Sequence, residues 1–255
     1  MCQLLAMNCN TPTDICFSFE GFCERSGVTD EHKDGWGIAF FEDQACRLFI
    51  DTKPAVESPI SNLVKSYPIK SLNVIAHIRK ASIGKVELAN THPFQRELWG
   101  MNWIFAHNGD LWDFAPKHNG RFLPIGTSDS ENAFCYILEH FEKKYASYPG
   151  LETLYKDLEE LGNEIAKFGT FNFLLSNGEG LLARNSTKLC YIVRQAPFAE
   201  AHLLDKDYTI NFSEHTTKDD RVAIIATEPL TDNETWTHFK EHQLILFKNG
   251  ELILS

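Results

Sequence analysis

The chain has 255 residues, of which 43% are hydrophobic, and it carries a formal net charge of −11 at pH 7. This length and apolar content suffice for one substantial core or two small ones, whereas the acidic balance disfavours nucleic acid or an anionic membrane as a partner. No basic segment precedes the N-terminal apolar stretch, and the longest apolar runs, such as residues 222–226, are too short to span a bilayer. We therefore expect a soluble protein of the cytoplasm.

Short apolar runs typical of strands dominate the first half of the sequence, at residues 3–7, 37–41, 47–50, 74–76 and 103–106. Between them, residues 59–67 show apolar side chains at helical spacing. The clearest helix is predicted over residues 128–145, which begin with the capping-box pattern Ser128-Asp129-Ser130-Glu131. A second helix follows at about 151–167, where leucines recur at intervals of three and four residues.

Strand-like runs return after these helices, at residues 171–175, 181–183, 190–193, 222–226, 243–247 and 252–254. The sequence contains no obvious linker, internal repeat or low-complexity tract. Strands, a helix pair and further strands are typical of sheets covered by helices. We expect an α+β fold in one layered domain over residues 1–255.

The cysteines do not form a recognisable framework. Their number is odd and none are spaced as C-x-x-C, which argues against both a disulfide scaffold and a structural zinc site. The first four recur at every seventh residue, but Asn8, Asn10, Pro12 and Gly21 oppose a continuous helix through them. We interpret that interval as chance. The seven positions are 2, 9, 16, 23, 46, 135 and 190.

Cys2 directly follows the initiator methionine, and a small second residue permits removal of Met1. One residue would then carry both a thiol and a free α-amine. Such an amine titrates near pKa ~7.7–8.0, so it can accept the thiol proton at neutral pH. The alternative is an ordinary buried cysteine at the start of a strand.

Residues 104–109 form an apolar run that ends in Asn108-Gly109. An Asn-Gly pair is commonly a hairpin turn, but residues 110–112 are not a clean return strand. The alternative is chemical, because the Asn108 amide and the Gly109 N–H are two donors that can meet at one point. An oxyanion hole needs that arrangement.

Arg79 and Asp129 are a complementary pair of charges. The planar guanidinium of Arg79 suits a carboxylate, although a structural ion pair explains it equally well. Asp129 can accept from an ammonium group or cap the helix that starts there. Together with Cys2 and Asn108-Gly109, the pair describes a ligand that has an α-carboxylate, an α-ammonium and a distal amide carbonyl, as glutamine does.

A metal site is the competing interpretation of the histidines. His77, His92 and His107 with Asp129 would offer enough ligands for zinc. However, no H-x-x-x-H or similar spacing is present, and histidines on apolar strands are more commonly hydrogen-bonded core residues. We expect neither a metal nor another cofactor.

These segments, in this chain order, resemble the glutaminase domain of the class II glutamine amidotransferases, which are N-terminal-nucleophile hydrolases. The resemblance rests on Cys2, residues 77–82, Asn90-x-His92-Pro93, His107-Asn108-Gly109 and residues 127–131. The length of the chain and residues 33–39 are similar, more specifically, to the YafJ-type stand-alone amidotransferases. The resemblance implies a four-layer αββα sandwich, in which two antiparallel sheets lie between helical layers.

The resemblance also implies a role for each matching residue. Cys2 would be the nucleophile that forms a γ-glutamyl thioester and releases ammonia, and Asn108 and Gly109 would form the oxyanion hole. Arg79 would bind the substrate carboxylate and Asp129 its ammonium group. Two further positions are implied beside the substrate: Ser82, where the family often has a threonine, and His92, which would shape the turn beside the pocket.

Three departures from the family pattern leave the substrate open. Lys80 stands where relatives usually carry an aromatic residue, Ile83 replaces a polar residue of the sugar-phosphate members, and residues 30–34 differ from the usual arginine-bearing loop. Three hypotheses remain. The chain is a glutaminase with a separate ammonia-accepting synthase subunit, a γ-glutamyl amide or peptide hydrolase, or a catalytically silent binding module.

Overall fold

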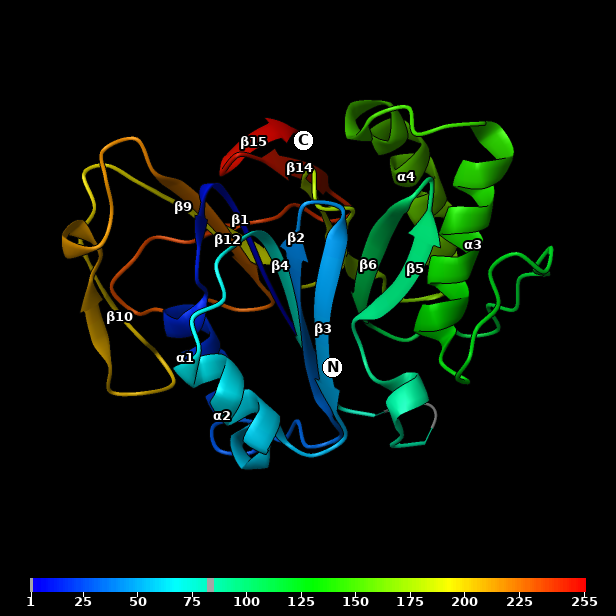
Figure 1. Ribbon diagram of the computed structural model, residues 1–255. Coiled ribbons are helices and arrows are strands. Elements are labelled where there is room, and N and C mark those ends of the chain that lie inside the picture. The colour runs from blue at the N-terminus through cyan, green and yellow to red at the C-terminus, as the bar shows by residue number, and fades with distance from the viewer. Residues whose placement is uncertain (1, 82–84) are drawn as a thin grey trace.

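Two antiparallel sheets lie face to face in the structure, a computed structural model that describes residues 2–81 and 85–255 (Figure 1). In the described residues the first sheet has seven strands, which are, in spatial order, β13 (Thr237–His238), β9 (Cys190–Gln195), β12 (Arg221–Ala226), β1 (Gln3–Thr13), β4 (Ser71–Ile78), β2 (Trp36–Glu42) and β3 (Ala45–Asp51). The second has six, β15 (Glu251–Leu254), β14 (Leu244–Lys248), β8 (Leu181–Arg184), β7 (Asn172–Ser176), β6 (Met101–Asn108) and β5 (Phe94–Leu98). A separate ribbon pairs β10 (Glu200–His202) with β11 (Thr209–Asn211).

Helices cover the outer face of each sheet. α1 (Cys16–Glu24) and α2 (Pro59–Ser66) pack on the seven-stranded sheet, and α3 (Asp129–Lys144) and α4 (Leu151–Ile165) pack on the six-stranded sheet (Figure 1). Short 3₁₀ turns occupy Ala55–Glu57, Leu88–Asn90, Ala166–Phe168 and Phe212–Glu214. The order of layers is helices, sheet, sheet, helices, which confirms the αββα sandwich of the N-terminal-nucleophile hydrolases.

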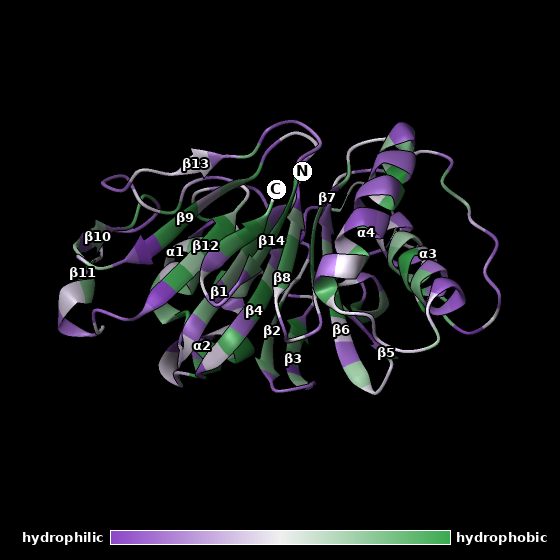
Figure 2. Ribbon diagram, turned by 90° about the horizontal axis from the view of Figure 1, so that it is seen from above, coloured by the Kyte–Doolittle hydropathy of each residue, from purple (hydrophilic) through white to green (hydrophobic). Residues whose placement is uncertain are grey.

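Three apolar cores separate these layers, as the alternation of strand side chains requires. Leu5 and Met7 of β1 face the first helical layer, whereas Leu4 and Ala6 enter the core between the two sheets. The third core lies between the six-stranded sheet and the helices. In Figure 2 the hydrophobic colour gathers on the central strands, and hydrophilic residues lie on the outer parts of α3 and α4.

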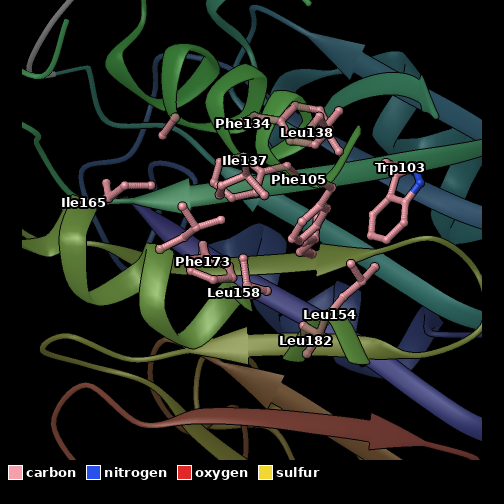
Figure 3. Close-up of a cluster of buried hydrophobic side chains, with 14 of the residues drawn as sticks. Trp103, Phe105, Phe134, Ile137, Leu138, Leu154, Leu158, Ile165, Phe173 and Leu182 are labelled. Atoms are coloured by element: carbon pink, nitrogen blue, oxygen red, sulfur yellow. The ribbon is translucent and has the colours of Figure 1, made fainter. Parts of the chain in front are cut away.

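The helix pair forms where its apolar stripes predict it. Figure 3 shows Phe134, Ile137 and Leu138 of α3 in one cluster with Leu154 and Leu158 of α4. Phe105 of β6 stacks on Phe134, with ring centroids 5.2 Å apart and planes 6° apart. Among the described residues, no helix combines the length and the apolar content that crossing a membrane requires.

Among the described residues, five α-helices and strands were not predicted, namely α1, β5 and the short strands β10, β11 and β13, and two of them have a clear physical reason. The first is α1, which contains Gly21, a residue that disfavours helix. Leu203 lies so close that a Cβ at this position would be 2.9 Å from its methyl carbon, so the glycine serves packing between segments distant in sequence. Cys16 and Cys23 lie on this helix, whereas Cys9 lies on β1. The cysteines that recur at every seventh residue therefore do not share one helix. The second is the edge strand β5, where the sequence reads as a turn with polar residues after it.

The capping box at the start of α3 is only half formed. Ser128 is the N-cap, and its hydroxyl accepts from the N–H groups of Ser130 (3.1 Å) and Glu131 (3.4 Å). In the predicted box the Glu131 carboxylate would accept from the Ser128 N–H. Instead it accepts from the N–H groups of Ile125 (3.0 Å) and Gly126 (2.8 Å), so it fixes the loop before the helix.

Candidate active site

The pleat of three strands directs three of the predicted site residues into the space between the sheets. The residues that already fill this space are Leu4 and Ala6 of β1, Ile75 of β4, and Ile104 and Ala106 of β6. Continuing each alternation brings Cys2, Arg79 and Asn108 to the same interior face. Gln3 pairs with Ile78, so Cys2 and Arg79 lie opposite each other one step further along the two strands.

Cys2 is half-buried, and its sulfur contacts one residue of the neighbouring segment twice. The Lys80 N–H donates to Sγ (3.3 Å), and the thiol donates to the Lys80 carbonyl oxygen (3.4 Å). Burial raises the pKa of Cys2 to about 11, against the smaller lowering effects of the Lys80 N–H and the Arg79 charge, and the Asp110 carboxylate raises it further. The resting group is therefore a neutral thiol at pH 7, and it needs a base in order to attack.

Arg79 follows the end of β4 and is buried. Its main chain is held on both sides, because its N–H donates to the Gly35 carbonyl (2.8 Å) and its carbonyl accepts from the Asp34 N–H (3.1 Å). The guanidinium donates to the Lys85 carbonyl (3.0 Å), which ties it to the loop before Asn90. Ser82 and Ile83 lie outside the described residues.

Asn108 ends β6 with a fully buried side chain, and neither its amide nitrogen nor its amide oxygen has a hydrogen-bond partner among the described residues. A buried polar group without a partner costs about 1–3 kcal/mol, so such a group is unusual in a folded protein. β6 pairs with β5 and β7, and the chain does not turn back at this point. Asn108-Gly109 is therefore not a hairpin turn.

Gly109 has a steric reason to be glycine. A Cβ on this residue would lie 1.9 Å from the Thr170 carbonyl oxygen, so the two backbones approach each other too closely for any side chain. This contact is independent of catalysis. It fixes the path of the main chain directly after Asn108.

Asp129 is the first residue of α3 rather than its N-cap, which is Ser128. One carboxylate oxygen accepts from the Leu111 N–H (2.7 Å) and the other from the Ser130 N–H (2.9 Å). Asp129 thus joins the start of the helix to the loop that follows Asn108 and Gly109. It lies half-buried at that junction.

The His92 ring packs against the His77 ring, with centroids 4.2 Å apart and planes tilted by 30°. None of the four ring nitrogens of this pair has a hydrogen-bond partner among the described residues. The turn approaches β2 closely, because a Cβ on Gly37 would lie 2.4 Å from the His92 carbonyl oxygen. Gly37 therefore makes room for the His92 turn.

The three histidines do not converge as metal ligands. His107 lies on the opposite face of β6 from Asn108, where Nε2 donates to the Thr170 carbonyl (3.0 Å) and Nδ1 lies 2.8 Å from the Ser130 hydroxyl. Both ring nitrogens are thus engaged within the protein. Over residues 2–81 and 85–255, no cluster of three or more histidine, cysteine or acidic side chains is arranged to hold a metal.

The buried imidazoles predict a loss of stability in mild acid. Burial lowers the pKa of His77 to about 3 and that of His92 well below its ordinary value of 6.5. Below that value the unfolded chain binds protons that the folded chain does not, so each histidine reduces the free energy of unfolding by about 1.4 kcal/mol per pH unit. Well above pH 6.5 both rings are neutral in both states, and the effect vanishes.

Urea unfolding at pH 7.5, 6.5 and 5.5 measures this slope. His77→Asn removes one ring of the His77–His92 pair and is expected to make the loss between pH 6.5 and 5.5 shallower. A free energy of unfolding that stays constant over that interval in the wild type contradicts the prediction.

Two cavities differ in their relation to these residues. A cavity of about 170 Å³ opens beside Cys2, and its charged lining residues are Asp30, Lys80, Lys188 and Glu228. A larger cavity, of about 490 Å³, opens at the far end of β1, and none of the predicted site residues lines it. We place the candidate site at the smaller cavity because Cys2 lines it, although Cys2 is the one predicted site residue in its lining among the described residues.

Three features of the site were not predicted from the sequence: the Lys80 backbone at the Cys2 sulfur, the charge of Asp110 near the thiol, and the contacts of Asp34 with residues 79–81. Gly35 and Gly37, which follow Asp34, are a local signal in the sequence for a tight segment there. Its partner could not be read from the sequence, because strand pairing brings together residues more than forty positions apart.

Comparison with known proteins agrees with this fold. The family model described as "Glutamine amidotransferases class-II" matches residues 1–255, and the chain belongs to this family. A Haemophilus influenzae protein named "Putative glutamine amidotransferase" is 53% identical over 254 residues, which cover 99% of this chain and 86% of that protein.

Two further relatives match over their whole length. The Escherichia coli protein named "Putative glutamine amidotransferase YafJ" is 50% identical over 255 residues, covering 100% of both chains. The crystal structure of a "predicted glutamine amidotransferase" from Pseudomonas aeruginosa PA01 superposes with a TM-score of 0.80 at 43% identity, covering 99% of this chain and 100% of that one.

Proposed function

We propose that this protein hydrolyses the side-chain amide of glutamine through a γ-glutamyl thioester on Cys2 and so releases ammonia. The observation that carries the proposal is the position of the Asn108 amide. It is buried and unpartnered among the described residues, and it shares the interior face of the sandwich with Cys2 and Arg79. A preorganised donor of this kind is what a tetrahedral oxyanion requires.

The first half-reaction begins once Met1 has been removed. The Cys2 α-amine, directly or through a water, takes the thiol proton while Sγ attacks the amide carbon of glutamine. The Asn108 amide and the Gly109 N–H donate to the oxygen as it gains negative charge. The carbon–nitrogen bond then breaks, and the leaving nitrogen takes the proton from the α-ammonium and departs as ammonia.

The second half-reaction releases glutamate. The α-amine removes a proton from water, which attacks the thioester carbonyl, and the same two donors bind the second oxyanion. The carbon–sulfur bond breaks and the sulfur regains its proton. Throughout, Arg79 binds the α-carboxylate of the γ-glutamyl group and Asp129 its α-ammonium, so the substrate stays aligned with Cys2.

A second candidate function is the hydrolysis of γ-glutamyl amides or peptides. The cavity beside Cys2 favours it, because the lining carries both signs of charge, with Lys188 donating to Glu228 (2.8 Å) at its edge. Such a lining suits a leaving amine that carries its own polar groups better than it suits ammonia alone.

The test of function compares glutamine with a series of γ-glutamyl amino acids, and glutamate release is measured for each. Faster turnover of glutamine supports the glutaminase, and faster turnover of the γ-glutamyl amino acids supports the second candidate. Release of glutamate from none of them contradicts both. The proposal includes a glutaminase whose ammonia is used by a separate synthase subunit. Ammonia that passes to a partner rather than to solvent would indicate that arrangement.

Recognition of the γ-glutamyl group supplies a further prediction. Arg79→Ala is expected to raise KM for glutamine about 10- to 100-fold, since a hydrogen bond to a charged group contributes about 1.5–3 kcal/mol. Arg47→Ala is the matched control, because its side chain is exposed and paired with Glu42 (2.8 Å) on the edge strand β3, and it does not line the cavity beside Cys2. The measurement is steady-state kinetics of both variants.

Asp129→Asn separates charge from structure at the other anchor. An asparagine oxygen can still accept from the Leu111 N–H, whereas the attraction to an ammonium is lost. We expect a raised KM with a nearly native melting temperature. An unchanged KM in Asp129→Asn means that the residue only joins the helix to its loop.

A further inference from the structure

Asp34 lies in the turn before β2 and holds the segment that contacts the nucleophile. Its carboxylate accepts from the Ala81 N–H (2.7 Å), and its own N–H donates to the Arg79 carbonyl (3.1 Å). The next residue, Gly35, accepts from the Arg79 N–H (2.8 Å). Residues 79 and 81 are thus fixed on both sides of Lys80, which is the residue at the Cys2 sulfur.

The bond to Ala81 orients one particular peptide group. The Ala81 N–H and the Lys80 carbonyl belong to the same trans peptide, so the two dipoles point in opposite directions. When the N–H points at Asp34, the carbonyl points away from it, toward the Cys2 thiol 3.4 Å from it. The carboxylate therefore determines the direction in which the thiol donates its hydrogen.

The main-chain and side-chain contacts of Asp34 have separable effects. Arg79 is held by the main chain of residues 34 and 35, which survives any substitution at position 34 except proline. The Lys80–Ala81 peptide is held by the side chain. A change of side chain should therefore disturb the nucleophile while leaving the substrate anchor in place.

We propose that Asp34 is a positioning residue for the Cys2 nucleophile, acting through the Lys80–Ala81 peptide. It does not touch the substrate. The proposal rests on the function proposed for Cys2. If Asp34 has this role, kcat depends on the acceptor oxygen of its side chain rather than on the charge of that side chain.

Three variants at position 34 test this assignment. Asp34→Ala removes the acceptor, and we expect kcat to fall about 10- to 100-fold, as misplacement of a reacting group by about 1 Å does elsewhere, with KM for glutamine within about threefold of wild type. Asp34→Asn keeps an acceptor oxygen and should restore most of kcat. Asp34→Glu carries the same charge one methylene further out and should stay slow, so it replaces Asp34→Ala if that variant does not fold.

Asp51→Ala is the matched control. Its carboxylate also binds a backbone N–H, that of Lys53 (3.1 Å), and a hydroxyl, that of Ser58 (2.5 Å), at the end of β3 rather than at Cys2. We expect native kcat from it, with any loss confined to the melting temperature. If the role of Asp34 were only structural, Asp34→Ala would likewise keep native kcat and lose only melting temperature.

A second readout does not depend on glutamine turnover. The rate at which iodoacetamide alkylates Cys2, followed by peptide mass, should fall in Asp34→Ala and recover in Asp34→Asn. Native kcat and native alkylation in Asp34→Ala overturn the proposal, as does an Asp34→Asn variant no better than alanine. If the wild type shows no turnover at all, the proposed function fails, and the alkylation rates still decide the role of Asp34.

Discussion

Cys2→Ala is expected to abolish the release of glutamate from glutamine or any γ-glutamyl amide, to below about 10⁻⁴ of the wild-type rate. Without the thiol no thioester forms, and the oxyanion hole has no covalent adduct to stabilise. The fold should survive, because the side chain is only half-buried at the start of β1 and contributes little packing. Turnover is measured together with the melting temperature of the variant.

Cys46→Ala is the control for this substitution. Cys46 is also a half-buried thiol at a strand start, on β3, and its Sγ contacts only the carbonyl of Arg47 (3.7 Å) among the hydrogen bonds of the described residues. It should retain full activity. Equal turnover by Cys2→Ala and wild type would remove Cys2 as the nucleophile.

Asn108→Ala is expected to lower kcat by about 10²–10³, with a smaller change in KM, because the amide meets full negative charge only in the tetrahedral state. The same variant should melt at or above the wild-type temperature. Its amide has no partner among the described residues, so its removal abolishes a desolvation cost and breaks no bond. Combined with Cys2→Ala, it should cost little more than Cys2→Ala alone.

Asn172→Ala provides the contrasting result. This neighbour on β7 donates to the Asn108 carbonyl (2.9 Å) and accepts from the N–H groups of Ser186 (2.7 Å) and Thr187 (3.0 Å). It should therefore lose melting temperature. If Asn108→Ala also loses melting temperature while keeping native kcat, Asn108 is a structural residue and the oxyanion assignment is wrong.

The sequence predicted the elements whose pattern is local. The stripes of α3 and α4 and the apolar runs of the strands give side-chain periodicities that need no knowledge of partners. α1 was missed because Gly21 disfavours helix locally, and the packing that requires it comes from Leu203. β5 was missed because its polar residues 95–97 match an edge strand as well as a loop.

The sequence predicted which residues belong to the candidate site. It did not predict the hydrogen bonds that join them to neighbouring segments. Cys2, Arg79 and Asn108 could be nominated from their chemistry and order in the chain. The bonds from Lys80 to the sulfur and from Asp34 to Ala81 depend on the pairing register of β1, β2 and β4, which no local pattern specifies. The half-formed capping box has the same cause, since the loop before α3 competes for Glu131.

The central claim is that Cys2, freed at the N-terminus, is the nucleophile for a γ-glutamyl substrate. The intact mass of the protein, before and after exposure to a diazo-ketone analogue of glutamine, tests it directly. We expect a starting mass that lacks Met1 and a single adduct, formed with loss of dinitrogen, that maps to Cys2 and is absent from Cys2→Ala. A fully active protein that retains Met1 would exclude the α-amine as the base, and an adduct on another cysteine, or none, would contradict the claim.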